Sequence, residues 1–189
     1  GSIMTSRGCV FNCAFCHIAA EGEDSPAGEI GRFRIKSDER VFAEVQSLKN
    51  LGVRQVFLED DSFFGRKKRA IRLLRSLKGA GIDIFPMNGV NLIHLFDGPE
   101  PDIEVLEALR EAGCRELVLP FETGSSRIMK EYISNKFDGA KHNVEGLIRA
   151  CKELGFVTSG NYMIGWPDET LDEIQMTNMD DYMRARGFK

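Results

Sequence analysis

The sequence predicts an α/β fold, a partial (β/α) barrel of about five to six parallel strands with outer helices. An amphipathic helix, a glycine and a short β-rich run recur along the chain, and the turn glycines lie about 30 to 40 residues apart, the length of one βα unit. Helices that alternate with strands indicate a parallel sheet with helical crossovers. The 189 residues are fewer than the roughly 250 of a closed eight-fold barrel, so we expect a partial one.

Composition excludes several classes of protein. The chain is 42% hydrophobic and 29% charged, which is typical of a soluble globular protein, and its net charge of −4 argues against a general nucleic-acid binder. No apolar run approaches the roughly 18 to 20 residues that span a bilayer, and the first residues do not resemble a signal peptide. The five cysteines, an odd number, do not suggest a disulfide framework. We therefore expect a cytoplasmic protein without a membrane partner.

The predicted elements follow one another in a regular order. A first strand is expected just before Cys9, and the first long helix begins after Ser37, a plausible N-cap. That helix ends at Gly52, and residues 53–58 read as a buried strand. Three more helix–glycine–strand units follow, in the segments "KKRAIRLLRSLKGAGIDIF", "DIEVLEALREAGCRELVLPF" and "NVEGLIRACKELGFVTSGNYMIG".

A last helix, "ETLDEIQMTNMDDYMRARGF", reaches Gly187 with no strand behind it. The chain also starts abruptly before the cysteines. These two observations predict that residues 1–189 form one core domain that is truncated at both ends.

Three cysteines, Cys9, Cys13 and Cys16, stand in a C-x3-C-x2-C arrangement. A structural zinc site needs four protein ligands, and His17 adjoins Cys16 too closely to be a good fourth. A cubane iron–sulfur cluster also takes four ligands, so three thiolates would leave one iron open. Cys114 and Cys151 lie in predicted helical units and are expected to be small buried hydrophobic residues.

With Phe15 before the third cysteine, this motif resembles the signature of radical S-adenosylmethionine (radical SAM) enzymes. The resemblance implies that Cys9, Cys13 and Cys16 bind three irons of a 4Fe–4S cluster, while the fourth iron chelates the amino and carboxylate groups of SAM. One electron then cleaves a carbon–sulfur bond of SAM and starts radical chemistry. Phe15 is counted among the cofactor-binding residues.

Two acidic segments extend the resemblance. "LEDDSFF" is similar to the acidic pair of the branch that includes cobalamin-dependent members, and it implies that Asp60 or Asp61 receives the ammonium group of SAM. An ordinary acidic loop is the alternative. "PFETGS" is also similar to this branch, with Glu122 directed into the barrel mouth. The alternative is that Glu122 is an acid at the edge of the core that binds backbone amides.

The segment "MIGWPDET" resembles the family's fifth-strand segment. The resemblance implies that backbone at Ile164 and Gly165 lies along the adenine and that Asn161 reaches the ribose hydroxyls. A plain strand followed by a capped helix is compatible with the same residues.

One predicted helix is strongly basic. Its apolar residues share a face, so the cations are expected to point mostly outward, either as a solvated face or as a surface for RNA or another partner. These cations are Arg66, Lys67, Lys68, Arg69, Arg72 and Arg75.

The predicted function is therefore that of a radical SAM enzyme, which starts a methylation or a rearrangement of an unknown substrate, expected to be a small molecule. A one-electron donor such as flavodoxin or ferredoxin is an expected partner, whereas nucleic acid is not favoured. The chain contains no Asp-x-His-x-x-Gly motif, so cobalamin could be bound only by a missing domain. The alternatives are an RNA- or protein-modifying methylthiotransferase and a non-catalytic metal-stabilised scaffold.

Overall fold

The computed structural model describes residues 1–21, 28–88, 90–134 and 137–177. Parallel strands form two sheets in this part of the chain. The first has the order β1 (Ser2–Ile3), β4 (Gln55–Leu58), β5 (Asp83–Pro86), and the second pairs β8 (Glu116–Glu122) with β9 (Val157–Tyr162). The α/β prediction with parallel strands is confirmed. Within the described residues no closed sheet is formed.

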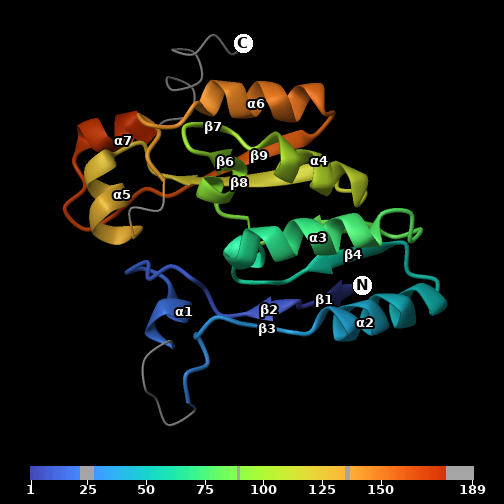
Figure 1. Cartoon of the computed structure of the whole chain (residues 1–189). Coiled ribbons are helices and arrows are strands. Elements are labelled where there is room, and N and C mark those ends of the chain that lie inside the picture. Colours follow the sequence, from blue (N-terminus) through green and yellow to red (C-terminus); the bar gives the residue numbers. More distant parts are fainter. Residues whose placement is uncertain (22–27, 89, 135–136, 178–189) are drawn as a thin grey trace.

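Four long helices alternate with the strands and lie along them in Figure 1. They are α2 (Asp38–Asn50), α3 (Lys67–Leu77), α4 (Ile103–Glu111) and α6 (Val144–Glu153). Each corresponds to a predicted unit.

Polar side chains fix where three of these helices begin. The predicted N-cap Ser37 accepts a hydrogen bond from the backbone N–H of Arg40, and Asp102 and Asn143 serve α4 and α6 in the same way. Gly113 ends α4 with a φ of 92°, and a Cβ at this position would lie only 2.2 Å from Asp83 Oδ1. Only glycine fits there, because both the backbone angle and the space exclude a side chain.

The hydrophobic core lies between the strands and these helices. Alternate strand residues are almost fully buried on the helix side, namely Val56, Leu58, Ile84, Leu117 and Leu119. Their neighbours Phe57 and Val118 are only half-buried, so the opposite face of the strands is less covered.

The start of the chain differs from the prediction. The first parallel strand ends at Ile3, and Ser6–Arg7 (β2) instead pairs antiparallel with Arg34–Ile35 (β3). Parallel pairing stops after Ile3 because the Thr5 N–H donates to the Asp60 carboxylate, which also binds the Ser6 hydroxyl, and Gly8, directly after β2, has a φ of 73°.

Several short elements were not predicted. They are α1 (His17–Ala20), the 3₁₀ helices η1 (Phe63–Arg66) and η2 (Leu92–Leu95), the antiparallel pair β6 (Phe96–Asp97) and β7 (Glu100–Pro101), and α5 (Ser126–Tyr132). The predicted last helix is present as α7 (Leu171–Thr177), and its predicted continuation to Gly187 lies outside the described residues. None of the helices in the described part of the chain is long and apolar enough to cross a membrane.

Candidate functional site

The predicted site residues gather at one end of the parallel strands. The cysteine loop follows β1, the acidic segment follows β4, Glu122 closes β8, and the segment with Gly165 follows β9. In Figure 1 this is the end where α1, α5 and α7 lie. Because parallel strands share their carboxyl ends, residues from four separate segments reach one edge.

Asp60 anchors the root of the cysteine loop. Its carboxylate is fully buried and accepts hydrogen bonds from the backbone N–H of Thr5 (3.0 Å), the hydroxyl of Thr5 (2.8 Å) and the hydroxyl of Ser6. Both oxygens are occupied by these donors. The acid therefore joins the end of β4 to the chain that leads into the loop.

None of the three loop cysteines forms a disulfide bond, and their environments differ. Cys13 is buried, whereas Cys9 and Cys16 are half-buried. The loop turns locally through a hydrogen bond from the Cys16 N–H to the Cys13 carbonyl (3.0 Å), and α1 starts directly afterwards. Three cysteine thiols in one short loop are a donor set that suits iron–sulfur ligation.

Cys114 and Cys151 lie elsewhere and are fully buried, as predicted. Burial raises the pKa of each thiol to about 12, so both stay protonated at neutral pH. Cys114 precedes β8, at the opposite end of the strands from the loop, and its thiol donates to the Glu116 carbonyl (3.1 Å). In the described parts of the chain, no group of three or more His, Cys, Asp or Glu side chains could hold a single metal ion.

The far side of the cysteine loop rests on α5 and on the segment after β9. The Ala14 N–H donates to the Tyr132 carbonyl (2.8 Å) at the end of α5. The ring of Phe15 meets the ring of Trp166 edge to face, with centroids 5.2 Å apart, and Tyr132 lies 5.7 Å from the same indole. Phe15 thus connects the cysteine motif to the fifth-strand segment.

Asp61 and Glu59 flank the buried Asp60 and are both half-buried. Asp61 Oδ2 accepts the Gly8 N–H at 2.8 Å, and Glu59 Oε2 accepts from Asn88 at 3.1 Å. Of the two acids considered for the SAM ammonium group, the structure leaves Asp61 near the surface and encloses Asp60.

Glu122 occupies an unusual backbone conformation. Its φ is 64°, in the left-handed region, and the pairing register of β8 with β9 shifts between Pro120 and Glu122. A non-glycine residue there costs roughly 1 to 3 kcal/mol and occurs mostly where the surroundings require it. The Glu122 carbonyl accepts the Met163 N–H at 2.7 Å, which holds the next segment against the strand end.

The segment after β9 is largely exposed. Asn161, Ile164 and Gly165 all reach the surface, and Gly165 has a φ of 89°. The N–H groups of Gly165 and Trp166 both donate to the Glu169 carboxylate, at 2.6 and 3.2 Å. This small turn presents its backbone on the exposed side.

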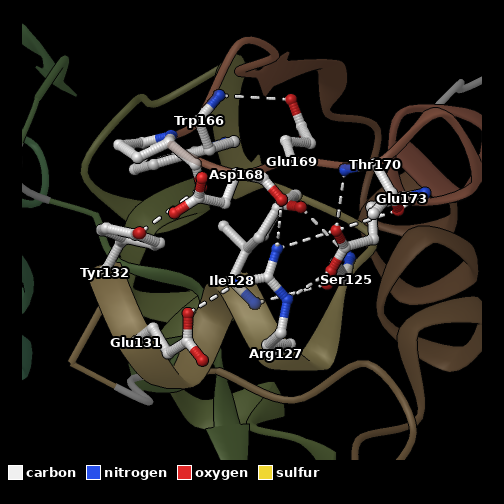
Figure 2. A network of polar contacts seen from close by, with 12 residues as sticks. Ser125, Arg127, Ile128, Glu131, Tyr132, Trp166, Asp168, Glu169, Thr170 and Glu173 are labelled. Atoms are coloured by element: carbon white, nitrogen blue, oxygen red, sulfur yellow. Dashed lines mark hydrogen bonds and ion pairs between the residues drawn. The ribbon is translucent and has the colours of Figure 1, made fainter.

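A polar network, shown in Figure 2, fixes this segment to α5. Arg127 of α5 donates to both oxygens of Glu173 (2.9 and 2.8 Å) and to the Asp168 carbonyl (3.1 Å). Glu173 also accepts from the Ser125 hydroxyl and from the Thr170 N–H. Hydrogen bonds from Arg127 first, and then from Thr170 and Ser125, hold the pKa of Glu173 far below its usual range.

Sequence reasoning missed these supporting residues. Tyr132, Trp166 and the Arg127–Glu173 pair come from segments more than thirty residues apart, and no local pattern joins them. Trp166, the single tryptophan of the chain, was the strongest available signal, because it stands inside a segment already singled out.

Comparisons with known proteins agree on one family. The sequence profile described as the Radical SAM superfamily matches residues 3–178. An uncharacterized methyltransferase of Pyrococcus horikoshii is 32% identical over 94% of this chain and 35% of its own length. The cytidylyl-2-hydroxyethylphosphonate methyltransferase of Streptomyces wedmorensis is 26% identical over 100% of this chain and 33% of its own length.

Solved structures give the same fold. The radical S-adenosylmethionine methyltransferase TsrM from Kitasatospora setae, with cobalamin and a [4Fe-4S] cluster bound, superposes with a TM-score of 0.73 at 22% identity. The match covers 98% of this chain and 32% of TsrM. The chain thus spans about a third of the length of the relatives it matches.

Proposed function

Because the chain belongs to the Radical SAM superfamily, we propose that Cys9, Cys13 and Cys16 hold a 4Fe–4S cluster that binds SAM. The observation that carries the proposal is the anchored loop, which places three cysteines outside any disulfide at the carboxyl end of the sheet. When bound, the cluster supplies the electron that breaks a carbon–sulfur bond of SAM.

The protein's own residues hold and orient these groups. Asp60 fixes the root of the loop, and Tyr132 and Trp166 support its far side. Asp61 is assigned to the SAM ammonium group, since both oxygens of Asp60 are occupied.

The nucleoside of SAM is assigned to the ends of β8 and β9. Glu122 and Asn161 face its ribose and adenine, and the backbone of Ile164 and Gly165 lies along the base. The exposure of Asn161, Ile164 and Gly165 and the left-handed backbone at Glu122 and Gly165 support this assignment. Phe15 packs against Trp166 and covers the cluster on that side.

The reaction proposed is methyl transfer to an unreactive atom of a small molecule. The two relatives described above, both methyltransferases by name, favour methylation over the alternative of methylthio transfer. Residues 1–189 would form the radical SAM core as a partial barrel of five to six strands, and any cobalamin would be bound by another part of a longer protein. This is supported by the fraction of the relatives that the chain matches.

The same proposal includes a one-electron donor of the flavodoxin or ferredoxin type. A cytoplasmic location is part of the proposal as well, because none of the five cysteines forms a disulfide bond and the loop needs reduced thiols.

The test is to reconstitute the chain anaerobically with iron and sulfide. Cys9→Ala, Cys13→Ala or Cys16→Ala is expected to abolish cluster binding, measured as iron and sulfide content. Cys114→Ala and Cys151→Ala are matched controls that should retain it, since both thiols are buried away from the loop. SAM should also change the electron paramagnetic resonance spectrum of the reduced protein. A cluster that survives loss of Cys13, or a spectrum that SAM leaves unchanged, would disprove the assignment.

A further inference from the structure

The thiol of Cys9 borders a hollow on the outer surface. The hollow has a volume of about 350 Å³, and its walls include Cys9, Val10, Arg32 and Phe33. Backbone contacts bring these segments together, since the Cys9 N–H donates to the Gly31 carbonyl (3.2 Å) and Cys9 pairs with Arg32 as an isolated bridge. The proposed cluster is therefore approached from outside along residues 31–33.

A second hollow of about 450 Å³ adjoins this segment at the start of α3. It is lined by Ile35, Arg66, Lys67, Lys68, Arg69 and Arg72. Gly65 lies between residues of the two hollows, since it precedes Arg66 and a Cβ at this position would lie 2.8 Å from the ring of Phe33 and 3.0 Å from Val10. Gly65, which precedes Arg66, thus lies close to Val10, the residue after Cys9.

Ion pairs account for most of the cations on α3. Lys67 pairs with Asp102, Arg69 and Arg72 pair with Asp38, and Arg75 pairs with Glu104. Arg69 is also buried, contrary to the expectation that it points outward, because it donates to the Lys36 carbonyl as well. These four cations are paired with carboxylates of this chain and need no partner from another molecule.

Three exposed cations remain near the two hollows. Arg66 and Lys68 have no carboxylate partner within the described residues, and Arg34 donates only to the carbonyls of Ile30 and Arg32. Arg32, exposed and paired with Glu29 at 2.6 Å, lies beside them. We call Arg32, Arg34, Arg66 and Lys68 the basic face. Three of its four cations have no carboxylate partner within the described residues, although the chain as a whole carries a net charge of −4.

We propose that the basic face is the docking surface for an acidic one-electron carrier protein, an inference that rests on the proposed function. SAM cleavage consumes one electron for each carbon–sulfur bond broken, so a carrier must lose one electron and be oxidised each time SAM is reduced. A carrier docked on the basic face lies beside the hollow at Cys9. Opposite charges raise the rate of such encounters and hold the complex weakly, as in other transient electron-transfer pairs.

The residues around the cations favour a protein over RNA as the partner that binds the basic face. Binding to single-stranded RNA generally combines cations with exposed aromatic rings on which bases stack. Here the apolar residues exposed beside the cations are Val10, Ile30 and Ile35, none of them aromatic, and Phe33 is half-buried.

The experiment compares two double variants with the same change of charge. Arg66→Glu with Lys68→Glu alters the basic face, and Arg149→Glu with Lys152→Glu alters exposed positions on α6. Arg34→Glu tests the face from a different element. The Kd for an oxidised flavodoxin is measured by flavin fluorescence at low and high salt, on protein with and without the cluster.

The basic-face variants are expected to raise the Kd for flavodoxin at low salt by roughly tenfold or more, with the difference from wild type shrinking at high salt. The α6 variant should stay within about twofold of wild type. An unchanged Kd in the basic-face variants overturns the proposal. So does a variant that loses affinity for a single-stranded RNA while it keeps its affinity for flavodoxin.

Reductive SAM cleavage separates this inference from the proposed function. With dithionite as the reductant, the basic-face variants should cleave SAM as fast as wild type, whereas with reduced flavodoxin they should be slower. If wild type does not cleave SAM with dithionite, the proposed function fails, and the Kd comparison still decides the docking surface. Equal rates of all variants with flavodoxin contradict the docking surface alone.

Discussion

Neighbouring acids in this chain have separate tasks. Asp60 is enclosed and satisfies three donors from Thr5 and Ser6, while Asp61 stays half-buried with one oxygen on the Gly8 N–H. A buried acceptor that loses its donors, or is turned into a donor, carries a large desolvation penalty, whereas a half-buried one does not. The two positions can therefore be distinguished by what their substitution impairs.

Asp60→Asn is expected to lower the free energy of unfolding by about 1 to 3 kcal/mol, because the amide nitrogen would face a hydroxyl or N–H donor. Asp61→Asn should leave stability nearly unchanged and weaken SAM binding by about ten- to a hundred-fold if it pairs with the ammonium group. Denaturant unfolding and calorimetric SAM titration measure the two effects. Loss of SAM affinity in Asp60→Asn at unchanged stability would reverse the assignment.

At the level of elements, α5 and α7 form the support of the site. α5 carries Ser125 and Arg127 at its start and the Tyr132 carbonyl at its end, so one short helix contacts both the segment after β9 and the cysteine loop. Figure 2 shows how Glu173 of α7 lies at the centre of this arrangement. The helix is only seven residues long, which means that these contacts rather than helix propensity stabilise it.

The pKa of Glu173 predicts the pH dependence of this support. Because the folded pKa is depressed, the stabilisation is complete above the ordinary glutamate pKa of about 4.3 and is lost as the pH falls below it. Glu173→Gln should therefore be less stable at pH 7 and lose less further stability between about pH 5 and pH 3. Thermal unfolding across this range measures the difference.

Glu131→Gln is the matched control. Glu131 also pairs with Arg127, at 2.7 Å, but its side chain is 48% exposed, so the pair contributes little. We expect its pH profile to follow that of the wild type. A Glu173→Gln protein with the acid sensitivity of the wild type would show that the network does not stabilise the fold.

For the whole molecule, the site is assembled from loops that follow separate strands. The strands before these loops belong to two separate sheets, so a ligand that touches several loops should stabilise the assembly. Since SAM is proposed to need the cluster, its stabilising effect should depend on the cluster.

In cluster-loaded protein, SAM at a hundred times its Kd should raise the free energy of unfolding by about 2.7 kcal/mol. After the cluster is removed with a chelator, the same SAM concentration should raise it by much less. Anaerobic thermal unfolding with and without SAM compares the two forms. Equal stabilisation of both would show that SAM binds independently of Cys9, Cys13 and Cys16.

The sequence by itself determined the alternation of helices and strands, because apolar periodicity, N-caps and turn glycines are local signals. Ser37 and Gly113 act where they were expected. It also determined the family, since the three cysteines and the residue before the third stand within one short loop. The positions of Asp61, Glu122 and Gly165 at the carboxyl ends of strands followed from the same alternation.

Only the tertiary structure decided what each side chain does at that end. It enclosed Asp60 and left Asp61 near the surface, although both follow the same strand. It ended the parallel pairing of the first strand at Ile3, paired Ser6–Arg7 with Arg34–Ile35 antiparallel, and joined Arg127 to Glu173 across 46 positions of sequence. Such contacts depend on which segments meet in space, and no local pattern of residues records that meeting.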